Sequence, residues 1–136
     1  MIPKSRAVKG TCWFVNLGDE PENGDVLYKV RPCIVVSANE FNRHSDCLTV
    51  VPITSRRNRK RKTHTIIETD KIKGIAKAEQ MRTISKNQLQ SFVCKMDADV
   101  MQKVAKSIAY HLFDDDMTVS NTDDKVVLTI KKRGSE

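Results

Sequence analysis

The chain has 136 residues, of which 39% are hydrophobic and 30% are charged, and its formal net charge is +7 at pH 7. This balance excludes a disordered chain and predicts one domain, residues 1–136, with a core of its own. No apolar run is long enough to span a membrane, and residues 1–9 lack the apolar block of a secretion signal, so we expect a cytoplasmic protein. The positive charge favours an anionic partner.

The cysteines and histidines form no metal-binding pattern. No two cysteines have the CxxC spacing, and no two histidines have the HxH or HxxxH spacing. In a reducing compartment we expect the cysteines to be small buried hydrophobes. The sequence therefore predicts no metal site and no cofactor. The residues concerned are Cys12, Cys33, Cys47, Cys94, His44, His64 and His111.

The first predicted strand covers Thr11–Leu17, which is rich in aromatic and β-branched residues. The loop that follows, Gly18–Lys29, is long for a hairpin connection, and loops of this length are often functional or mobile. It is either a solvated connector or a lid that brings one acid close to Arg31. Its acids are Asp19, Glu20, Glu22 and Asp25.

Two short apolar runs, Cys33–Val36 and Leu48–Ile53, are predicted to be buried strands, because both are rich in β-branched residues. A polar loop that holds Asn42 separates them. Arg31 directly precedes a proline before the first run, and Thr54 comes two residues after a proline in the second. Because proline is confined to strand starts and bulges, we expect both side chains to emerge at strand ends. If the two strands pair, Arg31 and Thr54 lie beside each other on a rigid support.

A nearly continuous basic run, residues 56–62, directly follows this second strand. Most charge runs are solvated loops. Here the run follows a strand end that carries a candidate hydroxyl, Thr54, and this position favours contact with phosphate groups.

Two further strands are predicted at Thr63–Glu68 and Ile75–Ile84. Within the second, Gln80 and Arg82 share one face, because side chains alternate with a period of two along a strand. Beyond it, Ser85–Ser91 is predicted to be one helical turn and Phe92–Met96 a short strand.

The clearest predicted helix begins after Asp97, which suits the N-cap position. Apolar residues then recur at helical spacing and form one stripe that favours core packing. The acids from Asp114 to Asp116 end the helix, because acids are disfavoured at its negative end. Alternating apolar residues predict an extra strand at Lys125–Lys131. The stripe is Val100, Met101, Val104, Ala105, Ile108, Ala109 and Leu112, while Lys103, Lys106 and Ser107 face away.

Several short strands, turn signals between them and one late helix predict a mainly β (α+β) fold, a small β-barrel with a helix packed on it. We place its core at about residues 10–113 and read residues 114–136 as an extension.

A set of short motifs occurs along this core in a specific order and spacing. The motifs are Gly10 to Trp13, Arg31-Pro32 with the following Ile-Val-Val-Ser, Asn39-x-x-Asn42, Val51-Pro-Ile-Thr-Ser55, Glu79-Gln-Met-Arg-Thr-Ile-Ser-Lys86 and Leu89. Together they resemble the MazF/PemK-type toxins of type II toxin–antitoxin systems.

The resemblance implies an SH3-like barrel, usually a homodimer, that acts as a metal-independent endoribonuclease on short sequences in single-stranded RNA. It also implies an antitoxin with an acidic, disordered tail, and DNA binding together with that antitoxin. Arg31 and Thr54 match the catalytic pair. The residues implied beside the RNA are Ser55, Arg56, Arg57, Gln80 and Arg82.

The implied chemistry suits these side chains. When the substrate 2′-hydroxyl attacks, the enzyme must stabilise a phosphorane and move protons, and the products are a 2′,3′-cyclic phosphate and a 5′-hydroxyl. A guanidinium at Arg31 offers paired donors to phosphate oxygens, and Thr54 adds a hydroxyl. Guanidinium hardly deprotonates, so we assign Arg31 first to phosphorane stabilisation, and acid–base work by Arg31 would require a depressed pKa or a relay through substrate or water. Asp25, Glu22 or Glu20 orients Arg31 or serves as base.

Three features depart from the family pattern: Thr11 stands where an acid is frequent, the first loop is longer, and the basic run is denser. Two alternatives stay open. One is a toxin like CcdB, which shares the barrel and poisons DNA gyrase without being an enzyme. The other is an SH3-like nucleic-acid-binding module, which would show salt-sensitive binding without turnover.

Overall fold

The computed structural model describes residues 3–22, 24, 26–55, 61–114, 116–121 and 126–131. No helix within these ranges is long and apolar enough to cross a membrane. The strands are β1 (Thr11–Asn16), β2 (Val30–Val35), β3 (Cys47–Thr54), β4 (His64–Glu68), β5 (Lys73–Lys77), β6 (Arg82–Ser85), β7 (Leu89–Lys95), β8 (Asp116–Asn121) and β9 (Val126–Lys131). The helices are α1 (Asn39–His44) and α2 (Ala98–Phe113), with short 3₁₀ turns at Lys4–Arg6, Ala78–Gln80 and Lys86–Gln88.

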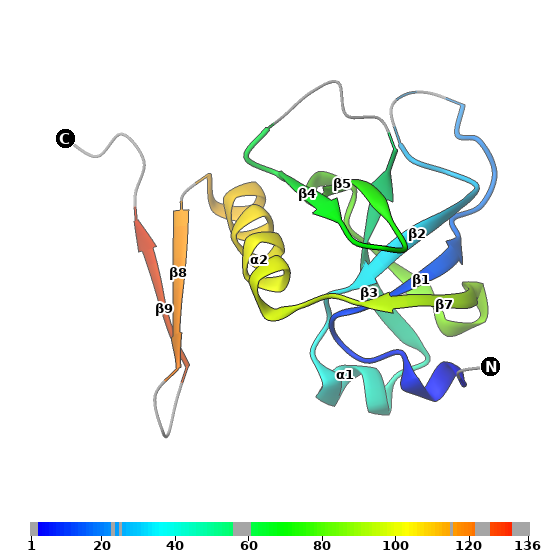
Figure 1. The fold of residues 1–136 in the computed structure, drawn as a ribbon, viewed down its shortest axis with the longest axis horizontal. Coiled ribbons are helices and arrows are strands. Elements are labelled where there is room, and N and C mark those ends of the chain that lie inside the picture. The colour runs from blue at the N-terminus through cyan, green and yellow to red at the C-terminus, as the bar shows by residue number, and fades with distance from the viewer. Residues whose placement is uncertain are drawn as a thin grey trace.

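Seven strands form one antiparallel sheet in the order β4-β5-β3-β2-β1-β7, and β6 also pairs with β3. The sheet bends strongly but does not close into a barrel, and β4 and β7 form its edges (Figure 1). The prediction of a mainly β fold with a late helix is confirmed. The two central apolar runs are neighbouring strands, β2 and β3, as predicted.

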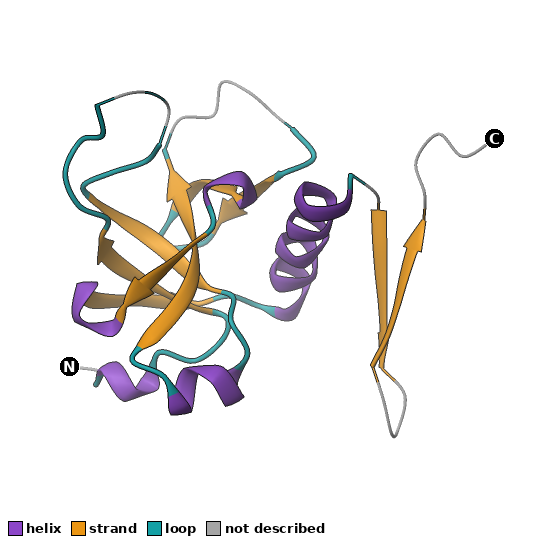
Figure 2. Cartoon of the chain, turned by 180° about the vertical axis from the view of Figure 1, so that it is seen from behind, coloured by secondary structure: helices purple, strands orange, loops and turns teal. Residues whose placement is uncertain are grey.

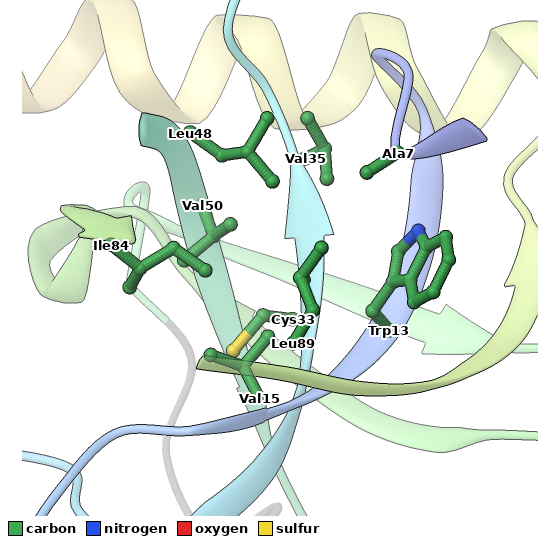
Figure 3. Close-up of a cluster of buried hydrophobic side chains, with 9 residues drawn as sticks. All are labelled: Ala7, Trp13, Val15, Cys33, Val35, Leu48, Val50, Ile84 and Leu89. Atoms are coloured by element: carbon green, nitrogen blue, oxygen red, sulfur yellow. The ribbon is translucent and has the colours of Figure 1, made fainter. Parts of the chain in front are cut away.

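One hydrophobic cluster lies on one face of the sheet and includes Trp13 of β1, Cys33 of β2 and Leu48 of β3 (Figure 3). Trp13 packs edge-on against the ring of Phe92, with 5.6 Å between the ring centroids. Its indole Nε1 donates to Thr11 Oγ1 over 3.0 Å, so this buried ring has a partner for its N–H.

A second cluster lies between the opposite face of the sheet and α2. It includes Ile34, Val51 and Ile67 from the strands and Val104 from the helix. Because side chains alternate along each strand, the two faces of β2 and β3 feed the two clusters separately. Central strands buried on both faces explain why their sequences read as continuous apolar runs.

Helix α2 begins as predicted. Asp97 occupies the N-cap, and its Oδ1 accepts the backbone N–H of Val100 over 2.9 Å. The helix ends at Asp114, whose φ of 57° gives the left-handed C-cap conformation.

The predicted burial of α2 is wrong at two positions. Ser107, expected to face away, is buried and hydrogen-bonds with Thr65 of β4 over 2.9 Å between the hydroxyl oxygens. Leu112, expected in the core, lies in the last turn of α2 and is exposed.

The polar segment between β2 and β3 is a short helix, α1, and not the predicted loop. Asn42 is buried within it, where its Nδ2 donates to the Ser37 carbonyl over 2.9 Å. The Ser37 hydroxyl donates to Asn42 Oδ1 and accepts the Thr49 N–H. These side-chain bonds attach α1 to the start of β3 and give Asn42 a structural role.

The single strand predicted at Ile75–Ile84 is two strands, β5 and β6, separated by a 3₁₀ turn. Both strands pair with β3, but β5 pairs with its end and β6 with its beginning. The two pairings differ in register, and the turn Ala78–Gln80 takes up the difference. This break places Gln80 in a turn beside the end of the sheet.

Beyond α2, strands β8 and β9 form a hairpin. The predicted extra strand is confirmed as β9, while β8 was missed because the acids before it were read only as a helix stop. The hairpin lies on the side of α2 away from the sheet (Figures 1 and 2).

Candidate functional site

Arg31 and Thr54 lie at the ends of neighbouring strands. The pairing of β2 with β3 ends with Cys33 opposite Pro52. If that register were continued by two residues, Arg31 would stand opposite Thr54. Side chains opposite each other in an antiparallel pair have Cβ atoms about 5 Å apart and point to the same face. The juxtaposition of Arg31 and Thr54 is consistent with a continuation of this register and stays a prediction.

The guanidinium of Arg31 is half-buried and held by backbone. Its Nε donates to the carbonyl oxygen of Tyr28 over 2.9 Å. Its two terminal nitrogens make no hydrogen bond within the described part of the chain. The arginine is therefore oriented by one edge and presents its other donors at the strand end.

The residues just before Arg31 form a tight closure. Lys29 has a φ of 68°, which turns the chain sharply at the entrance to β2. Its carbonyl accepts the Leu17 N–H, and its own N–H donates to the Gly18 carbonyl, each over 2.8 Å. These bonds close the base of the β1–β2 loop.

Gln80 and Arg82 hold the same loop from the other side. Gln80 Oε1 accepts the Leu27 N–H over 3.1 Å, and Arg82 Nη1 donates to the Leu27 carbonyl over 2.9 Å. Arg82 Nη2 also donates to Gln80 Oε1 over 3.1 Å. The two side chains thus contact each other, and both bond the backbone of Leu27, although Gln80 lies in a turn and not in the predicted strand.

The Cys33 thiol lies in the field of both arginines. Burial raises the pKa of Cys33 to about 12, although the guanidiniums of Arg82 and Arg31 act in the opposite direction. Burial also lowers the pKa of Arg82. Cys33 Sγ itself donates to the Arg31 carbonyl over 3.5 Å.

Thr54 is only 3% exposed, so its hydroxyl lies in the floor of the site. It is positioned by β5, where Ile75 pairs with it. The adjacent Gly74 allows the close approach of β5, because a Cβ there would meet the Thr54 carbonyl oxygen and come within 2.9 Å of Ile53 Cγ2.

The remaining predicted site residues are distributed as follows. Ser55 is exposed directly after β3, and Glu20 and Glu22 are exposed in the β1–β2 loop. Asp25, Arg56 and Arg57 lie outside the described residues.

Sequence reasoning missed Leu27 and Tyr28, which contribute backbone groups to this site. A backbone contact leaves no residue-type signal, so no motif could have identified them.

Sequence reasoning also missed a cleft of about 370 Å³ between α2 and the edge strand β4. Its charged lining residues are Arg61, Lys103 and Lys106. No group of His, Cys, Asp and Glu that could hold a metal ion occurs in the described ranges.

The turn that carries Gln80 is fixed by a pair with β4. Glu79 Oε2 lies 2.9 Å from His64 Nε2, and the His64 side chain is 4% exposed. Burial tends to raise the pKa of Glu79, but hydrogen bonds from His64 and Thr63 outweigh it and the pKa is lowered from 4.5.

This pair predicts a pH dependence of stability. A carboxylate whose pKa is depressed on folding contributes stability that is present above its unfolded pKa and is lost as the pH falls through the folded value. We expect the difference in free energy of unfolding between wild type and Glu79→Gln to be constant above pH 4.5 and to shrink below it. Urea titrations across roughly pH 3 to 7, the range in which carboxylates titrate, measure it. An equal dependence in the exposed control Glu68→Gln would contradict the assignment.

The comparisons agree with this architecture. The family model for the PemK-like, MazF-like toxin of type II toxin–antitoxin systems matches residues 9–112. The resemblance read from the motifs is thereby confirmed over nearly the same residues. No curated protein matches this chain.

Solved structures with the same fold include three that are similar across most of both chains. An endoribonuclease from Mycobacterial species is 23% identical with a TM-score of 0.65, and the match covers 77% of this chain and 89% of that chain. An endoribonuclease in complex with its cognate antitoxin, also from Mycobacterial species, is 24% identical with a TM-score of 0.67, covering 77% and 93%. MazF from Deinococcus radiodurans is 19% identical with a TM-score of 0.68, covering 82% and 97%.

Proposed function

Because this chain belongs to the PemK-like, MazF-like toxin family, we propose that it is a sequence-specific endoribonuclease that cleaves single-stranded RNA without a metal ion. The observation that supports the proposal is the pairing of β2 with β3, whose register, if continued, brings Arg31 and Thr54 together at adjoining strand ends. Two of the similar structures are endoribonucleases, one of them in complex with its antitoxin.

In the proposed reaction the 2′-hydroxyl of the substrate attacks the adjacent phosphorus and the bond to the 5′-oxygen breaks. The 2′-hydroxyl loses a proton and the leaving 5′-oxygen gains one, which yields a 2′,3′-cyclic phosphate and a 5′-hydroxyl. The terminal nitrogens of Arg31 stabilise the charge that builds on the phosphorane oxygens. Thr54, which is buried, donates from the floor of the site.

Proton transfer is assigned to other groups, because a guanidinium rarely gives up its proton near neutral pH. Glu20 and Glu22 stand exposed in the loop that leads to Arg31, and each is a candidate base.

We propose further that the protein works as a homodimer in the cytoplasm and that a cognate antitoxin with an acidic segment neutralises it. The net charge of +7 supports an acidic partner.

The test is to incubate purified protein with single-stranded RNA in EDTA and to map the 5′ ends of the products. We expect cuts at a short recurring sequence, with 5′-hydroxyl and 2′,3′-cyclic phosphate ends. A single reaction therefore reports activity, sequence preference and end chemistry.

Two outcomes would contradict the proposal. Intact RNA together with gyrase-dependent DNA breaks would favour a toxin like CcdB. Salt-sensitive RNA binding without any cleavage would favour a simple binding module.

A further inference from the structure

We propose that Gln80 and Arg82 are positioning residues that hold the β1–β2 loop so that the Tyr28 carbonyl orients the Arg31 guanidinium. This inference rests on the proposed function, because it assigns the pair to the same reaction. It also replaces the sequence-based expectation that both side chains bind RNA directly.

The first step concerns the two hydrogen bonds that Gln80 and Arg82 make with the Leu27 backbone. Gln80 accepts its N–H and Arg82 donates to its carbonyl, so both backbone groups of one loop residue are satisfied by two side chains. A neighbouring strand would make the same two bonds. The pair therefore anchors the loop where no strand continues, across more than 50 residues of sequence.

The second step concerns the fixed orientation of the Arg82 guanidinium. Arg82 Nη2 donates to the same Gln80 oxygen that accepts the Leu27 N–H, and Arg82 Nε donates to the Gln80 carbonyl over 3.2 Å. A planar guanidinium with three engaged nitrogens has little freedom to rotate. Arg82 is also half-buried at the start of β6, which pairs with β3.

The third step is the relay to Arg31. Tyr28 directly follows Leu27, and its carbonyl accepts the Nε hydrogen of Arg31. On its other side, Lys29 is fixed by its bonds to Leu17 and Gly18. The carbonyl that orients the catalytic guanidinium is therefore held between two anchors, one of which is the Gln80–Arg82 pair.

These contacts also argue against direct RNA binding by the pair. A phosphate that recruited Arg82 would compete with the Leu27 carbonyl and with Gln80 for the same nitrogens. Losing those bonds would release the loop that orients Arg31. The side chains thus act through Arg31, and their loss should lower kcat and leave KM nearly unchanged.

The test compares two substitutions at Gln80. Gln80→Leu removes the oxygen acceptor, whereas Gln80→Glu keeps an acceptor for Leu27 N–H and Arg82. We expect Gln80→Leu to lower kcat by about 10–100-fold, since a misplacement of about 1 Å can cost that much. Gln80→Glu should remain within a few-fold of wild type. Gln102→Leu, on the exposed side of α2, is the matched control.

Direct RNA binding by Gln80 predicts a different result for the Gln80→Glu variant. If Gln80 touched RNA, Gln80→Glu would repel phosphate and raise KM at least as much as Gln80→Leu does. That result would overturn the proposal.

A second measurement tests the hydrogen bonds to Leu27 without RNA. Amide hydrogen exchange at Leu27 should be faster in Gln80→Leu and unchanged in Gln80→Glu and Gln102→Leu. Faster exchange with an unchanged kcat would refute the positioning role. If the wild-type protein cleaves no RNA, the proposed function fails, while the exchange pattern still supports or refutes the anchoring of Leu27 by Gln80 and Arg82.

Discussion

Arg31→Ala is expected to lower the rate of RNA cleavage by about 10²–10³-fold, the usual cost of removing one donor to a developing oxyanion. The reason is the position of Arg31 near the start of β2, where its terminal nitrogens make no hydrogen bond within the described residues. Cleavage of a fluorescent single-stranded RNA in EDTA, measured as kcat and KM, checks the result.

Arg31→Lys distinguishes charge from geometry. Lysine keeps the positive charge but loses the planar fork and the Nε bond to Tyr28, so we expect activity between those of wild type and alanine. Arg43→Ala is the control, because Arg43 is exposed on α1 and pairs only with Glu40 among the described residues. Full cleavage by Arg31→Ala with an intact fold would remove Arg31 from the active site.

Gly74→Ala is the second substitution with a large expected effect, on stability and activity together. Its new Cβ would collide with the backbone carbonyl of Thr54 and approach Ile53, and a backbone atom cannot move aside as a flexible side chain can. We expect a loss of about 1–3 kcal/mol in the free energy of unfolding, the usual cost of overpacking a core. Because β5 must shift against β3, we also expect slower cleavage.

Urea unfolding and the cleavage assay on the same preparation measure the two effects. Lys73→Ala, at the exposed neighbouring position of β5, is the control and should change neither. A Gly74→Ala variant as stable and as active as wild type would show that the approach of β5 does not fix Thr54.

Much of this fold was readable from the sequence because its local signals are strong. The β-branched runs in β2 and β3 predicted two buried strands, and the apolar stripe after Asp97 predicted α2 with its correct N-cap. These features depend on neighbouring residues, so the pattern along the chain contains them. The proline argument was less accurate, because Pro32 and Pro52 are paired residues inside β2 and β3 and do not mark strand starts.

Other features escaped because they depend on contacts between distant segments. The break between β5 and β6 is set by two different registers on β3, which no local pattern encodes. Ser107 was expected on the solvent side of α2, but its hydrogen-bond partner, Thr65, lies in strand β4 and was not foreseeable from the helix sequence. Asn42 was read as part of a loop because polar residues favour turns, yet its buried bonds to Ser37 complete a helix.

The site shows the same division. The candidate groups, Arg31, Thr54, Gln80 and Arg82, and the family of the chain could be read from the order of short motifs. What those groups touch depends on the folded arrangement of the strands. The fold holds Arg31 Nε against the Tyr28 carbonyl, and it turns Gln80 and Arg82 toward the backbone of Leu27. The physical reason is that side-chain identity is local, whereas a hydrogen bond to backbone depends on how distant segments meet and carries no residue-type signature.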